Sequence, residues 1–251
     1  MGFAAVPTTK LQRFETFTAE ANERIEAPEV HRAVSGALDI PEFQRGFVWS
    51  PKQVRDLAES LWLDYPIGFF LLWDNESNGN RAKRFWVVDG QQRVTSLCLM
   101  FKQEPRWWPR RNPNGWRKTA ERYEVRFDIE ATRPPFFRIP DSTISDEERF
   151  IPLWKLVTLS SEKELEPIVA RIKSRQLCRG VSEDDVRARL DSIRRIRDKL
   201  LLGTLLDHDL ESVFEIFRRL NSRGIRFRRL LLLILMKRLG AQWGERSVPY
   251  R

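Results

Sequence analysis

The chain has 251 residues, of which 44 are Lys or Arg and 35 are Asp or Glu, so its formal net charge is +9. Hydrophobic residues make up 41% of the sequence, which is enough to build a core in one large domain or two small ones. Two cysteines without a CxxC pair exclude a disulfide framework and a cysteine-based zinc site. The positive charge favours a polyanionic partner such as a nucleotide or DNA.

No basic segment followed by a long apolar stretch is visible near the start of the chain, so we expect no signal peptide. The longest apolar run, at residues 230–236, is too short to span a bilayer. We therefore expect a cytoplasmic protein with no membrane partner. The same run would form an exposed apolar patch unless it packs on another domain or subunit.

The first half of the chain is expected to mix strands and helices, after a weakly patterned start at residues 1–35. Ser50 can cap a helix, Pro51 suits the first helical position and Gln53 can complete a capping box, which predicts a helix to about residue 64. Further expected elements are strands at 38–41, 67–73, 84–88, 123–129 and 136–139, a helix at 91–101, and an irregular insertion at 102–120.

The second half is expected to be mainly helical. Its expected helices cover residues 162–177, 182–202, 210–220 and 226–239. The fold class is therefore α+β, with one domain at residues 1–140 and a helical subdomain at residues 141–251.

The run Asp89-Gly90-Gln91-Gln92-Arg93 lies where a strand passes into a helix. The first turn of such a helix presents free backbone N–H groups and the positive end of the helix dipole, which together bind phosphate. Gly90 permits a sharp turn, Arg93 can add a contact to phosphate oxygens, and Asp89 can hold a divalent metal or orient water. The alternative is an ordinary turn, with Asp89 as a cap and Arg93 on the surface.

Two further segments could contribute to a site. Gln44 and Arg45 follow the expected strand at 38–41 and lie among apolar residues, although a surface loop with Arg45 stacked on Trp49 explains them as well. Asn221 ends an expected helix within the run at residues 217–224, where it could close over a ligand. The alternative there is a C-cap with a solvated basic face.

The insertion at residues 102–120 interleaves aromatic rings with cations. Arg106, Trp107, Trp108, Arg110 and Arg111 could grip nucleic acid by stacking and by phosphate contacts. A loop fixed to the core by its tryptophans fits the same pattern, and the sequence does not separate these two interpretations.

Several motifs in order along the chain resemble one family. They are residues 40–49 (IPEFQRGFVW), 53–54 (QV), 65–68 (YPIG), 87–93 (VVDGQQR) and 213–224 (VFEIFRRLNSRG). Their order and spacing resemble the N-terminal domain family of the GmrSD-type modification-dependent restriction endonucleases, a relative of the ParB/sulfiredoxin fold. The resemblance implies a ParB/sulfiredoxin-like first domain and a nucleotide-hydrolysing regulatory function in bacterial anti-phage defence, coupled to cleavage of modified DNA.

The resemblance also implies roles for individual residues. Asp89, Gln91, Gln92 and Arg93 would form the phosphate and hydrolysis site, with a nucleoside triphosphate and Mg²⁺ as cofactors. Gln44 and Arg45 would face this site, and Asn221 would approach it from the helical half. Complete nucleases of the family carry a C-terminal His-Asn-His type metal site, which two histidines cannot supply, so a nuclease partner chain or domain is expected.

Two other functions remain open from the residues. One is a non-catalytic DNA-binding or regulatory module of the same fold, which the charge of +9 suits equally well. The other is nuclease activity of this chain alone, which the sequence favours less because no second acidic cluster with metal-site spacing is present.

Overall fold

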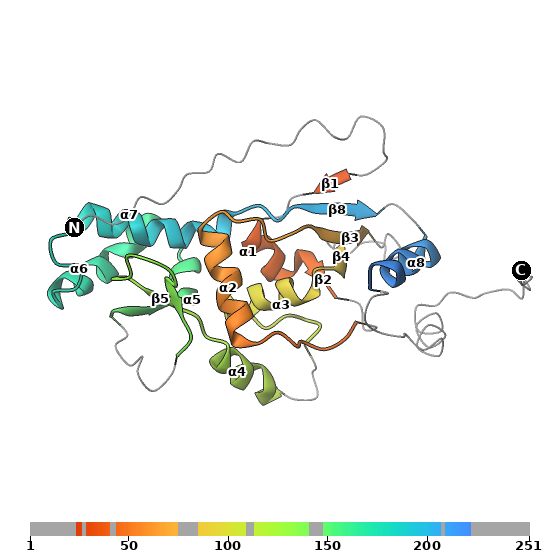
Figure 1. Ribbon diagram of the computed structural model, residues 1–251, viewed down its shortest axis with the longest axis horizontal. Coiled ribbons are helices and arrows are strands. Elements are labelled where there is room, and N and C mark those ends of the chain that lie inside the picture. Colours follow the sequence, from red (N-terminus) through yellow and green to blue (C-terminus); the bar gives the residue numbers. More distant parts are fainter. Residues whose placement is uncertain are drawn as a thin grey trace, which may run out of the picture.

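The computed structural model describes residues 24–26, 29–40, 44–74, 85–108, 113–140, 148–206 and 209–221. These residues form two sheets with helices around them, a mixed helix-and-strand fold that is compatible with the expected α+β class (Figure 1). None of the described helices combines the length and the apolar composition that crossing a bilayer would need.

The larger sheet has five strands. In spatial order they are β1 (Arg24–Glu26), β8 (Gly203–Leu206), β3 (Phe70–Asp74), β4 (Phe85–Asp89) and β2 (Leu38–Asp39). Strand β3 runs antiparallel to β4 and parallel to β8. The sheet is therefore completed by a strand from the second half of the chain. The expected domain boundary after residue 140 stays a prediction.

Helices cover one face of this sheet. They are α1 (Val30–Arg32), the π-helical turn η1 (Ala33–Ala37), α2 (Pro51–Trp62) and α3 (Gln91–Met100). The capping box at the start of α2 is confirmed, since Ser50 Oγ accepts the Gln53 N–H at 3.3 Å and Gln53 Oε1 accepts the Ser50 N–H at 2.9 Å. The apolar positions Val54, Leu57 and Leu61 of α2 are buried, as their helical spacing predicts.

The remaining elements lie mostly in the second half of the chain. The smaller sheet has the order β6 (Phe137–Arg138), β5 (Arg126–Asp128) and β7 (Phe150–Pro152). The other helices are α4 (Pro113–Arg122), α5 (Leu153–Val157), η2 (Glu162–Leu165), α6 (Glu166–Ser174), α7 (Glu183–Arg194), η3 (Arg195–Asp198) and α8 (Leu210–Asn221).

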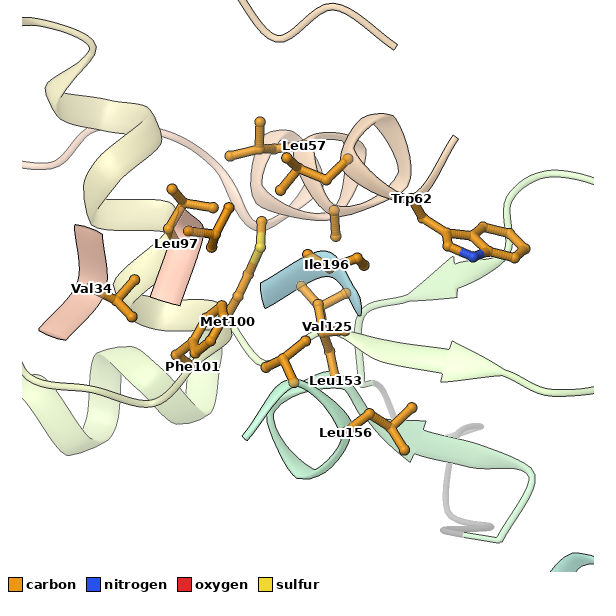
Figure 2. Close-up of a cluster of buried hydrophobic side chains, with 14 of the residues drawn as sticks. Val34, Leu57, Trp62, Leu97, Met100, Phe101, Val125, Leu153, Leu156 and Ile196 are labelled. Atoms are coloured by element: carbon orange, nitrogen blue, oxygen red, sulfur yellow. The ribbon is translucent and has the colours of Figure 1, made fainter. Parts of the chain in front are cut away.

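One hydrophobic core extends across both halves of the chain. Figure 2 shows side chains from four helical elements converging: Leu57 from α2, Met100 from α3, Leu153 from α5 and Ile196 from η3. A second, smaller cluster lies on the other face of the large sheet, where α8 packs. Its members are Trp73, Val88, Leu206, Val213 and Phe217.

The structure corrects several sequence-based expectations. The insertion at residues 102–120 is irregular only in its first part, because α4 begins at Pro113 and buries Trp116 and Ala120, one helical turn apart. The helix expected at residues 182–202 ends at Asp198, and β8 follows because it pairs with β3. Strand β3 begins at Phe70 rather than at residue 67. The helix expected at residues 226–239 lies outside the described residues.

Candidate functional site

The turn between β4 and α3 depends on a glycine. Gly90 precedes the first residue of α3 with φ 107°, a left-handed conformation that L side chains rarely adopt. A Cβ atom at this position would lie 2.5 Å from Cδ1 of Phe70 and 3.3 Å from Nη2 of Arg93. Both the backbone angle and the close packing therefore require glycine at this strand-to-helix turn.

Among the described residues, none caps the N-terminus of α3 with its side chain, and the N-cap residue itself is Gly90. The first N–H groups of any α-helix have no partner within the helix, so this end offers backbone donors and the positive end of the dipole. Asp89 ends β4 next to this terminus, and its side chain is 52% exposed. The expected turn thus places an accessible carboxylate beside a helix N-terminus.

Gln92 holds the loop at residues 44–49. Its Oε1 accepts the backbone N–H groups of Val48 at 2.8 Å and Trp49 at 3.3 Å, and its Nε2 donates to the Gly46 carbonyl at 3.2 Å. The side chain is buried in the process. Three of the hydrogen-bonding positions of this amide are therefore committed to the backbone of the neighbouring loop.

Gln91 and Gln44 join the same two segments. Gln91 Nε2 donates to the carbonyl of Arg45, and Gln44 Nε2 donates to the carbonyl of Val88 at 3.1 Å and to that of Val87. The side chain of Arg45 is exposed. The structure thus brings the two expected parts of the site together, since the loop of Gln44 and Arg45 is bonded to both β4 and α3.

Arg93 holds a second loop. Its Nη1 donates to the carbonyl of Ile67 at 2.8 Å, and its Nη2 donates to the carbonyl of Phe69 at 2.9 Å and to Oδ2 of Asp89 at 3.3 Å. The guanidinium carbon lies 4.6 Å from the ring centroid of Phe70, within reach of a cation–π contact. Burial lowers the pKa of Arg93, and the Asp89 carboxylate opposes that effect.

Residues 67–69 are a part of the site to which sequence reasoning gave no role. Their carbonyl groups are the acceptors for Arg93, and Gly68 has φ 84°. A Cβ atom on Gly68 would lie 2.7 Å from Nη1 of Arg93. Tyr65-Pro66 indicated the end of α2 and residues 67–73 were expected to form a strand, but nothing local indicated that an arginine about 25 residues later would bind to the carbonyl groups at its start.

Asn221 is the last residue of α8. Val213 and Phe217 of this helix pack in the smaller cluster with Val88, which directly precedes Asp89 in β4. The helix therefore lies against the strand that carries the turn. The role of Asn221 at the nucleotide stays a prediction.

In the tryptophan-rich insertion, Trp107 and Trp108 pack against the main hydrophobic core. Trp107 has a buried indole N–H, and Trp108 meets the buried Trp116 edge to face, with ring centroids 5.1 Å apart. These contacts favour a loop fixed to the core over a stacking surface. Arg106 is exposed, whereas Arg110 and Arg111 lie outside the described residues.

Comparison with known proteins identifies the family. The model of the GmrSD restriction endonuclease N-terminal domain matches residues 29–231. An uncharacterized protein of Methanocaldococcus jannaschii is 36% identical over 87 residues, a match that covers 27% of this chain and 15% of that protein's length. The family match spans strands β2, β3, β4 and β8 of the large sheet, the turn at residues 89–93 and α8. The chain therefore belongs to the family of GmrSD restriction endonuclease N-terminal domains.

Proposed function

We propose that this chain binds a nucleoside triphosphate through its phosphates at the turn of residues 89–93 and hydrolyses it with Mg²⁺. The observation that carries the proposal is the accessible Asp89 carboxylate beside the uncapped N-terminus of α3. Such a terminus attracts anions, and a carboxylate next to it can hold the cation that accompanies phosphate.

The phosphate would contact the first backbone N–H groups of α3. Within the described part of the chain, Arg93 directs three N–H groups to Ile67, Phe69 and Asp89, whereas a guanidinium has five donors. Its remaining donors and its charge would therefore assist phosphate binding, while the bonds it already makes fix its position. Gln91 adjoins the helix terminus and is proposed to orient the attacking water.

The proposed role of Gln92 is to position the loop at residues 44–49. Its amide oxygen and nitrogen are engaged by the backbone of that loop. That loop carries Gln44 and the exposed Arg45, and we propose that Arg45 contacts a phosphate or a ribose. Asn221 would approach the same nucleotide from the end of α8.

The residues present fit Mg²⁺ bound together with its nucleotide. In the described part of the chain, no group of three or more His, Cys, Asp or Glu side chains is placed to hold a metal. Mg²⁺ in nucleotide sites commonly uses one or two carboxylates plus substrate phosphates and waters, so Asp89 alone is a sufficient protein ligand. The ion would neutralise charge on the phosphates during transfer.

The family supports a coupling of this turnover to DNA cleavage. Its members are named as N-terminal domains of restriction endonucleases. We propose that this chain is the regulatory part of a cytoplasmic anti-phage system, with a ParB/sulfiredoxin-like nucleotide domain. A nuclease partner chain or domain would then cut the DNA.

The proposal is tested by phosphate release from ATP, GTP, CTP and UTP in the presence of Mg²⁺. Turnover should be lost in Asp89→Asn and Arg93→Ala. Asp198→Asn is the matched control, because Asp198 is also about half exposed and also pairs with an arginine, at 3.6 Å from Arg197. Thermal unfolding of each variant separates lost chemistry from lost folding. Normal turnover in Asp89→Asn would contradict the proposed metal role.

A non-catalytic DNA-binding module is the second candidate, and basic residues of α4 favour it. Arg117 and Lys118 are exposed on α4, and Lys52 is exposed at the start of α2. The two regions are joined, because Tyr123 Oη donates to the carbonyl of Trp49 at 2.7 Å. DNA affinity that falls steeply with salt, less steeply after Arg117→Gln and Lys118→Gln, without nucleotide turnover, would support this function.

A further inference from the structure

The two faces of β3 bury their side chains in different clusters. Phe70 and Leu72 belong to the main core under α2 and α3, whereas Leu71 and Trp73 pack with the smaller cluster. This is the alternation that a strand between two layers requires. The smaller cluster is closed by α8, which lies near the tips of the β3 and β8 arrows in Figure 1.

The opposite end of that second face is uncovered. Phe69 is 67% exposed, Leu202 is 44% exposed and Leu200 is 61% exposed. Phe69 and Leu202 lie side by side, because the Phe70 N–H donates to the Leu202 carbonyl at 2.8 Å and Phe70 is paired with Gly203. Phe69 directly precedes β3 and Leu202 directly precedes β8, and continuing the alternation of each strand by one residue puts both side chains on the face of Leu71 and Leu206. We call Phe69, Leu200 and Leu202 the open apolar face.

A segment of this chain suits the open apolar face in composition and reach. Residues 230–236 read Leu-Leu-Leu-Leu-Ile-Leu-Met, with no polar side chain. They follow α8, whose last residue is Asn221, after a connection at residues 222–229. Eight residues span up to about 28 Å when extended, whereas the four strand positions from Trp73 back to Phe69 cover only about 13 Å.

We propose that residues 230–236 dock on the open apolar face and extend the cluster that α8 begins. Docking removes both apolar surfaces from water, which is the dominant favourable contribution to such contacts. The covered face adjoins the candidate site, since the Phe69 carbonyl accepts a hydrogen bond from Arg93. The docked segment would therefore add buried contacts to the loop that Arg93 holds. The inference does not depend on nucleotide hydrolysis.

Photo-crosslinking of the full chain tests the contact directly. The crosslinking residue p-benzoylphenylalanine replaces Phe69 in one variant, Leu202 in a second and Val48 in a third. Val48 is the matched control, because its exposure of 58% lies between those of Leu202 and Phe69, but it lies on the loop held by Gln92. After irradiation and tryptic digestion, the peptide of residues 230–237 should be joined to residues 69 and 202 within single chains, and not to residue 48.

Two outcomes would overturn the proposal. One is the absence of any link between residues 230–237 and positions 69 and 202. The other is a link that forms only between two chains, which would assign the face to a second copy. A second measurement is the rate of tryptic cleavage after Arg229 and Lys237. This rate should rise on the order of ten-fold in Leu202→Asp and stay unchanged in Val48→Asp, because one lost apolar contact shifts docking by about that factor.

Discussion

The backbone N–H of Val48 donates a 2.8 Å hydrogen bond to Oε1 of Gln92, a side chain that is only 9% exposed. The first helical turn after the glycine therefore fixes a loop more than 40 residues earlier in the chain. Gln91 and Gln92 therefore fix the loop at residues 44–49 beside the turn, whether or not they also contact a ligand.

We expect Gln92→Ala to lower the free energy of unfolding by about 1–3 kcal/mol, because the N–H groups of Val48 and Trp49 lose a buried acceptor. Gln103→Ala, at an exposed glutamine just after α3, should change it by less than about 0.5 kcal/mol. Urea unfolding followed by circular dichroism measures both. Equal stabilities for the two variants would show that the loop does not depend on this amide.

Gly68→Ala should damage the site more than Gly180→Ala. Both glycines have positive φ, 84° and 77°, so each alanine variant carries a backbone cost of about 1 kcal/mol. Only the alanine at residue 68 meets a neighbour, Nη1 of Arg93 at 2.7 Å, whereas nothing lies within 4 Å at residue 180. Phosphate release should fall in Gly68→Ala alone. A similar fall in Gly180→Ala would attribute the effect to general destabilisation.

Glu124 should make stability depend on pH in the acid range. Burial raises the pKa of this carboxyl, but hydrogen bonds from Lys102 and Arg126 outweigh the burial and lower its pKa below the ordinary 4.5. A lowered folded-state pKa contributes stability that is present above about pH 4.5 and is lost as the pH falls through the folded-state value. The difference in unfolding free energy between wild type and Glu124→Gln should therefore be constant near neutral pH and shrink below pH 4.5. A difference that grows on acidification would contradict this.

Ser50→Ala should lower the unfolding free energy by about 1 kcal/mol, because the first turn of α2 loses the acceptor for the Gln53 N–H. Ser161→Ala is a useful comparison, since Ser161 precedes the short η2 helix and its N–H and Oγ both donate to Oε1 of Glu164, at 3.0 Å and 3.2 Å. Its effect should be smaller, as η2 has four residues and α2 has 12. Differential scanning calorimetry resolves shifts of this size. A larger loss in Ser161→Ala would reverse the expected ranking.

Local sequence patterns determined the elements that carry the candidate site. Ser50, Pro51 and Gln53 predicted the start of α2, and the Asp-Gly break after an apolar run predicted the passage from β4 to α3. Helix α8 was also predicted closely: the expected range was residues 210–220, and the structure has Leu210–Asn221. These features depend on capping, glycine geometry and apolar spacing within a few residues, so they can be predicted from the local sequence alone.

Tertiary contacts determined the rest. The helix expected to reach residue 202 ends at Asp198, and strand β8, which the sequence had not predicted, forms where Gly203 pairs with Phe70. The loop partners of Gln92 and Arg93 are backbone groups at residues 46–49 and 67–69, and the side chains there give no signal of these hydrogen bonds. The sequence thus located the turn at residues 89–93. Only the tertiary structure decided which side chains of this turn bind neighbouring loops and which face solvent. Hydrogen bonds from these side chains to the backbone of distant segments form only when packing brings those segments together.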